Sequence, residues 1–339
     1  MILVDKKLLK VFCFFLFFLF IFGCSNKSES KHLISGLTMG TTYNITILGN
    51  VENKTKLKTN LEEILDSVNI SFSTYIDNSE ISKINNYDTG LIELSKDFSY
   101  VLRKALYYCD ISNGKYDITI SPLVKLWGFE SFNDVKVPEN NLVVEQLTNI
   151  GYKKIHLSDN FLVKQNKKIQ IDLNSIAKGF AVDRISEFLY NNGFKNHLVE
   201  IGGELKSSIF GDNTKKWIIG IQNPQNSSVI KKINLLNMSM ATSGTYNNFF
   251  EINGVQYSHL INPITGFPIN HQTVSATVIS KECIDSDALA TVLMTMMPSE
   301  GIDFINQLSD IEAMIIKSDE KGNLIEYLSK GFGSFIVND

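Results

Sequence analysis

Three segments of the chain combine residue types that could bind a charged ligand or carry out chemistry. The first is Asp172–Gly179, with the sequence D-L-N-S-I-A-K-G, at a predicted junction between a strand and a helix. Free backbone N–H groups at a helix start attract anions, and Lys178 could add a positive charge beside a phosphate. Asp172 could accept hydrogen bonds from ligand N–H groups, and Ser175 could offer oxygen to a hard cation. A plain helix start, with Asp or Asn as the cap and Lys178 in solvent, explains the same pattern and is favoured by the pattern alone.

The second segment is D-A-L-A-T, from Asp287 to Thr291. Positions i and i+4 share one face of a helix, so the carboxylate and the hydroxyl would point the same way. Such a pair suits Mg²⁺, which takes few protein oxygens and completes its shell with water and phosphate. The alternative is an Asp that the helix dipole favours in the first turn, next to a Thr with no special role.

The third segment, Tyr257–Gly266, is predicted to be a strand that carries His259 and ends in a turn containing Pro and Gly. Functional groups gather in such loops on rigid supports. His259 could serve as a general base. The alternative is a His that is merely packed in its strand.

Other residues offer surfaces for a planar ring or a close backbone approach. Met39, Tyr75 and Tyr116 have polarizable or flat side chains. Gly202 and Gly203 would let the backbone come near a ligand. Core packing explains the first three equally well, and a strand bend explains the glycine pair.

The elements that must position these residues alternate irregularly along the chain. Period-two alternation predicts strands at 41–47, 197–201, 217–222, 257–261 and 273–279, and three short strands between 153 and 173. Helical spacing predicts helices over 57–68, 98–108, 176–191, 286–297 and 299–308, with Ser95 as an N-terminal cap. Adjacent strand pairs favour an α+β fold with mixed, largely antiparallel sheets and packed helices. The length allows one large domain or two small ones, and the family resemblance given below implies a single domain. The absence of a G-x-G-x-x-G or P-loop sequence argues against the standard nucleotide-binding folds.

The first 23 residues are predicted to be a secretory signal and not part of the fold. Three Lys precede the apolar run Val11–Gly23, which is shorter than the roughly 20 residues of a membrane-spanning helix. Ile21–Cys24 is similar to a bacterial lipobox, so Cys24 is the predicted lipidation site, and an ordinary signal peptide is the alternative. Residues 24–32 would form a polar tether, and residues 33–339 the functional domain. These features predict export and a lipid anchor in a bacterial membrane, with the domain facing the periplasm or the cell exterior.

The composition excludes several classes of protein. Loss of the signal removes three Lys and one Asp, so the net charge of the chain changes from −4 to −6. This mild acidity gives no support for nucleic-acid binding. Cys109 and Cys283 are too few for a disulfide framework and have no C-x-x-C metal-binding spacing. Whether they pair is left open by the sequence.

In this order, the motifs resemble those of the bacterial FAD:protein FMN transferase (ApbE) family over essentially the whole mature domain. The motifs are M-G-T at Met39, S-T-Y-x-x-x-S-E at Ser73, D-I-T-x-x-P-L-V-x-L-W-G-F at Asp117, D-L-x-x-I-A-K-G at Asp172, G-G at Gly202, A-T-S-G at Ala241, H-x-I-x-P-x-T-G at His259 and D-A-L-x-T at Asp287. The resemblance implies transfer of the FMN half of FAD to a Ser or Thr hydroxyl of an acceptor redox protein, with release of AMP and a requirement for Mg²⁺.

The resemblance also assigns roles to individual residues. It assigns FAD contacts to Met39, Tyr75, Lys115, Tyr116, Asp117, Asp172, Lys178 and Ile261, and Mg²⁺ binding to Ser175, Asp287 and Thr291. With the family's chemistry in view, His259 is the candidate base that takes the proton of the acceptor hydroxyl. A carboxylate base, or no base, stays open.

Two positions depart from the family pattern. Ala290 stands where some members have a metal-binding Asp, and Asn262 stands where the family has an Asp after H-x-I. The Asn262 departure keeps an Mg²⁺-dependent FAD pyrophosphatase open as an alternative. The Ala290 departure keeps a flavin-binding lipoprotein without catalysis open.

Overall fold

The computed structural model describes residues 30–88, 90–129, 135–211, 217–226, 228–245, 249–252, 255–258, 260–269 and 271–337. The predicted signal, Cys24 and His259 lie outside these residues, so their predicted roles stay predictions. Within the described residues, no helix combines the length and the apolar character needed to cross a membrane.

Antiparallel strands form the framework of the fold. The strands are β1 (Lys31–Thr38), β2 (Thr41–Leu48), β3 (Ile92–Glu93), β4 (Ile155–Ser158), β5 (Phe161–Lys164), β6 (His197–Ile201), β7 (Glu204–Ser208), β8 (Trp217–Gln222), β9 (Val229–Leu235), β10 (Ser239–Gly244), β11 (Phe249–Ile252), β12 (Val255–Ser258), β13 (Thr273–Ser280), β14 (Glu312–Ser318) and β15 (Leu324–Leu328). Eight of them form one sheet in the order β1-β2-β6-β7-β10-β13-β14-β15, and its neighbouring strands are antiparallel. The predicted α+β class is confirmed.

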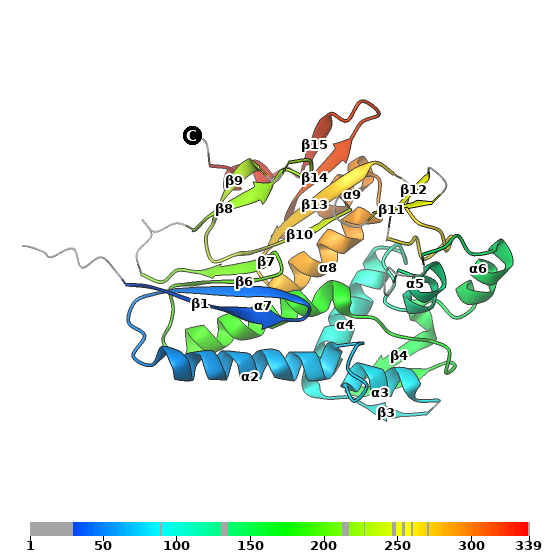
Figure 1. Ribbon diagram of the computed structural model, residues 1–339, viewed down its shortest axis with the longest axis horizontal. Helices are drawn as coiled ribbons and strands as arrows, with labels where there is room; N and C mark the ends of the chain where they lie inside the picture. Colours follow the sequence, from blue (N-terminus) through cyan, green and yellow to red (C-terminus); the bar gives the residue numbers. More distant parts are fainter. Residues whose placement is uncertain are drawn as a thin grey trace, which may run out of the picture.

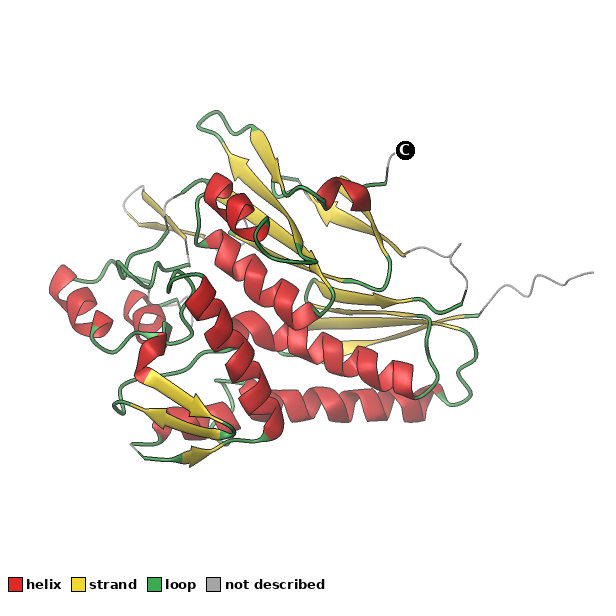
Figure 2. Cartoon of the chain, turned by 180° about the vertical axis from the view of Figure 1, so that it is seen from behind, coloured by secondary structure: helices red, strands yellow, loops and turns green. Residues whose placement is uncertain are grey.

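Helices cover one face of this sheet and build a side lobe (Figure 1). They are α2 (Lys54–Phe72), α3 (Glu80–Asn86), α4 (Lys96–Ile111), α5 (Ser121–Trp127), α6 (Asn140–Leu147), α7 (Asn174–Asn191), α8 (Cys283–Met294) and α9 (Pro298–Ile305), with the short 3-10 helices η1 (Tyr152–Lys154) and η2 (Phe332–Phe335). Figure 2 shows α2, α7 and α8 lying across the sheet. Ser95 caps α4, as predicted, because its side chain accepts the N–H of Phe98 at 3.2 Å.

The sheet is buried on both faces where it supports α8. On β13, Val278 belongs to the core under the helices, whereas its neighbour Ile279 packs into a second core. That second core includes residues of β8 and β9 and Phe332 of η2. Successive strand residues point to opposite faces, so β13 is buried along most of its length.

The prediction of three strands between 153 and 173 is wrong for the third. Strands β4 and β5 form a hairpin, but 165–173 is a loop. Its backbone bonds to other partners, since the N–H of Ile171 donates to Oδ1 of Asn85 at 2.7 Å and the N–H of Asp172 donates to the carbonyl of Ile118 at 2.7 Å. Alternating buried residues therefore gave this loop the pattern of a strand.

Cys109 and Cys283 are both buried and have free thiols. They do not form the disulfide that the sequence left open.

Helices α7 and α8 approach each other unusually closely at Gly179. A Cβ atom at this position would lie 2.4 Å from the carbonyl oxygen of Cys283 and 2.8 Å from Cβ of Asp287. Only glycine fits between the two helices here. This contact fixes the distance between the helix that carries Lys178 and the helix that carries Asp287.

A buried histidine joins α7 to strand β6. The Nδ1–H of His197 donates to the carbonyl of Phe194 at 2.6 Å, which leaves Nε2 to accept the hydroxyl of Ser186 at 2.8 Å. His197 is fully buried. Burial lowers its pKa to about 4, although the Phe194 contact opposes this shift. The imidazole is therefore neutral near pH 7.

We expect Gly179→Ala to lower the free energy of unfolding by about 1–3 kcal/mol, because overpacking forces the helices apart. Gly333→Ala is the matched control, since no atom lies within 4 Å of the added methyl group. Urea denaturation followed by circular dichroism measures both variants. Equal stabilities of Gly179→Ala and the unmodified protein would contradict the close approach.

We also expect His197 to make the folded state less stable in acid. Its folded pKa of about 4 lies below its ordinary value of 6.5, so between these values the unfolded chain binds a proton that the folded chain does not. The contribution is present above pH 6.5 and is lost as the pH falls toward 4. Between pH 7 and pH 5 it amounts to about 2 kcal/mol. Denaturation curves at both pH values should show this loss in the unmodified protein and a smaller loss in His197→Gln; equal losses would refute the assignment.

Candidate functional site

The start of α7 lacks the Asp or Asn cap that the plain helix-start alternative expected, because Leu173 occupies the cap position and no side chain makes a capping hydrogen bond. Oδ1 of Asp172 accepts the N–H of Asn174 at 2.8 Å. The side chain of Leu173 is fully buried, which anchors the turn in the core. The alternative is also wrong about Lys178, which does not extend into solvent but forms ion pairs with two carboxylates.

Lys178 lies between Glu204 of β7 and Asp287 of α8. Its Nζ is 3.3 Å from Oε1 of Glu204 and 3.8 Å from Oδ1 of Asp287. Burial alone lowers the pKa of Lys178, but the two carboxylates outweigh burial and raise it above its ordinary value. The ammonium group therefore stays charged and can neutralise a phosphate as well as its present partners.

Asp287 is oriented by the close contact between α7 and α8. Its Oδ2 accepts the N–H of Gly179 at 2.8 Å, and its side chain is almost completely buried. Burial raises its pKa, while Lys178 and the Gly179 N–H act in the opposite direction. Since Oδ2 is engaged, Oδ1 is the oxygen that remains for a cation.

Thr291 follows Asp287 by one helical turn, as the sequence spacing predicted. Its Oγ1 lies 3.3 Å from Oγ of Ser243 on β10. Ala290, between them on the helix, is fully buried in the main core. A side chain at this position faces packed residues, so the missing acidic group leaves the Asp287 and Thr291 oxygens in place.

Two cavities meet at the start of α7. One, of about 620 Å³, is lined by eleven residues that include Met39, Tyr75 and Lys178. The other, of about 230 Å³, is lined by the remaining predicted FAD contacts and by two predicted metal ligands, namely Lys115, Tyr116, Asp117, Asp172, Ile261, Ser175 and Thr291. Asn174 lines both cavities. Residues separated by more than 200 positions in the sequence are thus brought around one helix end.

Two tight hairpin turns shape the larger cavity. Met39 and Gly40 connect β1 to β2 with φ values of 50° and 73°, and Gly202 and Gly203 connect β6 to β7 with φ values of 63° and 106°. Positive φ at both central residues is the geometry of a two-residue hairpin. The turns touch, because a Cβ on Gly202 would lie 2.8 Å from Cγ2 of Thr41. The first turn holds Met39 at the cavity wall.

The predicted FAD contacts at 115–117 differ in how their side chains are engaged. The hydroxyls of Tyr116 and Ser175 lie 2.8 Å apart, and Lys115 pairs with Glu300. The buried carboxylate of Asp117 accepts hydrogen bonds from Thr119 at 2.8 and 2.6 Å and from the N–H of Tyr152 at 2.8 Å. Asp117 therefore shapes the loop that forms the cavity wall, and its predicted contact with FAD stays a prediction.

Asn262 organises the turn that follows Ile261. Its Oδ1 accepts the N–H groups of Ile264 at 2.8 Å and Thr265 at 3.2 Å. An Asp would offer the same oxygen to the same turn. The departure from the family pattern at this position is thus compatible with an unchanged loop between β12 and β13, next to the buried Ile261.

The site can hold a hard cation only with help from non-acidic donors. No group of three or more His, Cys, Asp or Glu side chains suited to a metal occurs in the parts of the chain that the structure describes. Asp287 supplies one carboxylate oxygen, and Thr291 and Ser175 supply hydroxyls. Such an oxygen-only, incomplete set fits Mg²⁺, which keeps waters and substrate phosphate in its shell.

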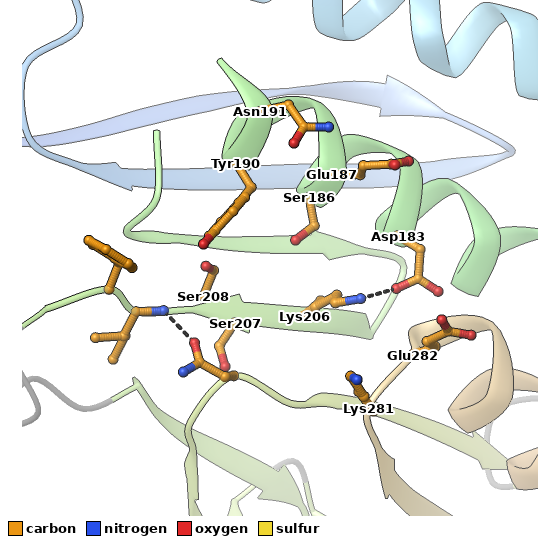
Figure 3. A pocket seen from close by; sticks show the side chains of 13 residues that line it. Asp183, Ser186, Glu187, Tyr190, Asn191, Lys206, Ser207, Ser208, Lys281 and Glu282 are labelled. Carbon is orange, nitrogen blue, oxygen red and sulfur yellow. Dashed lines mark hydrogen bonds and ion pairs between the residues drawn. The ribbon is translucent and has the colours of Figure 1, made fainter. Parts of the chain in front are cut away.

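A second pair of contacts joins α7 to the start of α8, one helical turn after Gly179. The carboxylate of Asp183 accepts the N–H groups of Cys283 at 3.0 Å and Ile284 at 2.9 Å, at the start of α8. Lys206 of β7 donates to the same carboxylate at 2.6 Å, as Figure 3 shows. Asp183 and Lys206 line a cavity of about 420 Å³. Through these contacts Asp183 holds α7, α8 and β7 together about one helical turn after Lys178.

Sequence reasoning missed Glu204 and Asn174. Glu204 directly follows the glycine pair that the sequence singled out, but a carboxylate at the first position of a strand gives no sign of a partner from another element. The sequence indicates Asn174 only as a possible helix cap. Its place between the two cavities follows from the turn at Leu173, which no local pattern encodes.

Comparison with known proteins places this chain among flavin transferases. The model of the ApbE family matches residues 39–315. The chain is 37% identical to the FAD:protein FMN transferase of Vibrio cholerae, with 94% of this chain and 96% of that protein covered. It is 36% identical to the enzyme of the same name from Haemophilus influenzae, over 86% and 89% of the two chains. The apo structure of the Pseudomonas stutzeri flavinyl transferase ApbE superposes with a TM-score of 0.83 at 29% identity, covering 91% and 97%.

Proposed function

Because this chain belongs to the ApbE family, we propose that it transfers the FMN moiety of FAD to a Ser or Thr hydroxyl of an acceptor protein, releases AMP and requires Mg²⁺. One observation carries the proposal. The described residues that the sequence assigned to FAD and to the metal line two adjoining cavities or, in the case of Asp287, lie directly behind Lys178.

The reaction exchanges the phosphoanhydride bond of the FAD pyrophosphate for a phosphoester bond to the acceptor. The acceptor oxygen forms a bond to the FMN phosphorus, the bond from this phosphorus to the bridging oxygen breaks, and the bridging oxygen leaves with AMP. Phosphoryl transfer of this kind depends mainly on positioning and on neutralising charge. Bound Mg²⁺ would supply charge neutralisation at the pyrophosphate and the leaving group.

The chain's own residues account for the remaining requirements. Lys178 places a permanent positive charge at the wall of the larger cavity, next to Asp287. Asp287 and Thr291 would hold the cation, and Ser175, positioned by Tyr116, lines the adjoining cavity. His259 is the proposed acceptor of the hydroxyl proton. Tyr75, which is 77% exposed, gives the flavin a flat surface at the open rim.

We further propose that the enzyme acts outside the cytoplasm. The support is the sequence alone, namely the basic and apolar segment of the first 23 residues and Cys24 in a lipobox-like context. A lipid at Cys24 would hold the domain at a membrane surface, where a membrane-bound redox protein could serve as the acceptor.

A single assay separates transfer from its alternatives. Purified protein is mixed with FAD, Mg²⁺ and a candidate acceptor domain, and the products are examined on a denaturing gel and by nucleotide analysis. We expect a fluorescent acceptor band and AMP. FMN and AMP without a labelled acceptor would instead establish an FAD pyrophosphatase. Intact FAD with every suitable acceptor would leave a flavin-binding protein without catalysis.

We expect Asp287→Asn to reduce Mg²⁺-dependent turnover by ~100-fold or more, since the cation loses its one carboxylate. Asp285→Asn is the matched control on the same helix, because the Asp285 carboxylate is held by Lys104 at 2.8 Å and by Tyr108 at 2.6 Å. Circular dichroism verifies that both variants are folded. Full activity of Asp287→Asn with Mg²⁺ as the only metal would contradict the proposed ligand set.

A further inference from the structure

We propose that Glu204 is a positioning residue that sets the Mg²⁺ affinity of the site by holding the Lys178 ammonium away from Asp287. This inference rests on the proposed function, because it concerns the cation that Asp287 and Thr291 would bind. Among the described residues Glu204 has no hydrogen bond or ion pair with either of them, and Lys178 is the shared partner of Glu204 and Asp287. The two carboxylates also repel each other directly, and a second pair of variants separates this effect from the one through Lys178.

Glu204 is buried in an unusual way for a carboxylate. Its side chain is 6% exposed, and its Oε1 faces Lys178, while Oε2 is buried without a hydrogen-bond partner. A buried acceptor without a partner is costly, and burial of a carboxylate is tolerated mainly where a charge compensates it. The local fold provides the place: Glu204 begins β7 directly after the Gly202–Gly203 turn, and a Cβ on Gly202 would lie 3.4 Å from Oε2.

The distances show which carboxylate holds the ammonium more closely. Nζ of Lys178 is 3.3 Å from Glu204 but 3.8 Å from Oδ1 of Asp287, which is longer than a hydrogen bond. The other oxygen of Asp287 is already bonded to the Gly179 N–H. Glu204 thereby keeps the remaining oxygen of Asp287 available to a cation.

Loss of the negative charge at position 204 would change the position of the Lys178 ammonium between the two carboxylates. With a neutral side chain there, Asp287 becomes the only close carboxylate for Lys178, so the ammonium moves toward Oδ1. An incoming cation must then displace it. Mutation of a residue that orients a metal ligand commonly weakens metal binding by about 10- to 100-fold. We expect a change of this size here.

The test is calorimetric titration of the full-length protein with Mg²⁺ alone. It is carried out at about pH 9, because burial raises the pKa of Glu204 to about 8 and the carboxylate must be ionised. Glu204→Gln should raise the Mg²⁺ dissociation constant by about tenfold or more, and Glu204→Asp, which keeps the charge, should raise it less. Glu200→Gln is the matched control. It removes the same charge from the neighbouring strand, where Glu200 accepts the Gly203 N–H at 2.8 Å, and should leave the constant unchanged.

A second pair of variants separates an effect through Lys178 from a direct electrostatic effect. In a Lys178→Met background the ammonium is absent, so Glu204→Gln should cause no further change in Mg²⁺ affinity. A similar weakening in both backgrounds would overturn the positioning role, as would unchanged affinity of Glu204→Gln itself. Circular dichroism confirms that each variant is folded, and the Glu204→Asp comparison tests the proposal independently of the Lys178 background.

The failures of the two proposals are distinguishable. If Asp287→Asn abolishes Mg²⁺ binding while Glu204→Gln does not weaken it, the proposed metal site is supported and the proposed role of Glu204 is refuted. If the unmodified protein binds no Mg²⁺, or if Asp287→Asn binds it normally, the metal assignment of the proposed function falls and the role of Glu204 falls with it.

Discussion

The site depends on one contact, the close approach of α7 and α8 at Gly179. The absence of a side chain there lets the Gly179 N–H reach the Asp287 carboxylate at 2.8 Å. The same contact brings Lys178, the preceding residue, to the same carboxylate. The proposed anion-binding and cation-binding groups, Lys178 and Asp287, are therefore placed by one interhelical distance. Any widening of this contact would change the hydrogen bond, the ion pair and the cavity wall together.

The rest of the fold keeps this contact under constraint. Asp183 bonds to the first N–H groups of α8 and to Lys206, so α7, α8 and β7 are joined beside the Gly179 contact. The buried strand β13 packs against α8 and has a hydrophobic core on each of its faces. Such support matters because charges buried in a fold contribute little net stability. Apolar packing stabilises the sheet and the helices, and these elements hold Lys178, Glu204 and Asp287 in place.

Much of the site could be predicted from the sequence because its signals are local. The spacing of Asp287 and Thr291 specifies one helix face, and the consecutive Gly202 and Gly203 specify a tight turn. Features that depend on partners distant in the sequence could not be predicted from local patterns. The pattern at 165–173 looked like a strand, but Asn85 and Ile118 take its backbone hydrogen bonds. Glu204 became recognisable only when the fold placed it against Lys178.

The most direct test of the account is a crystal of the protein grown with FAD and Mn²⁺ in place of Mg²⁺, with the metal located by its anomalous scattering. The account predicts one strong peak about 2.2 Å from Oδ1 of Asp287, close to Thr291, with the FAD pyrophosphate between this peak and Lys178. Bound FAD whose pyrophosphate lies away from Lys178, or a metal peak away from Asp287, would contradict it.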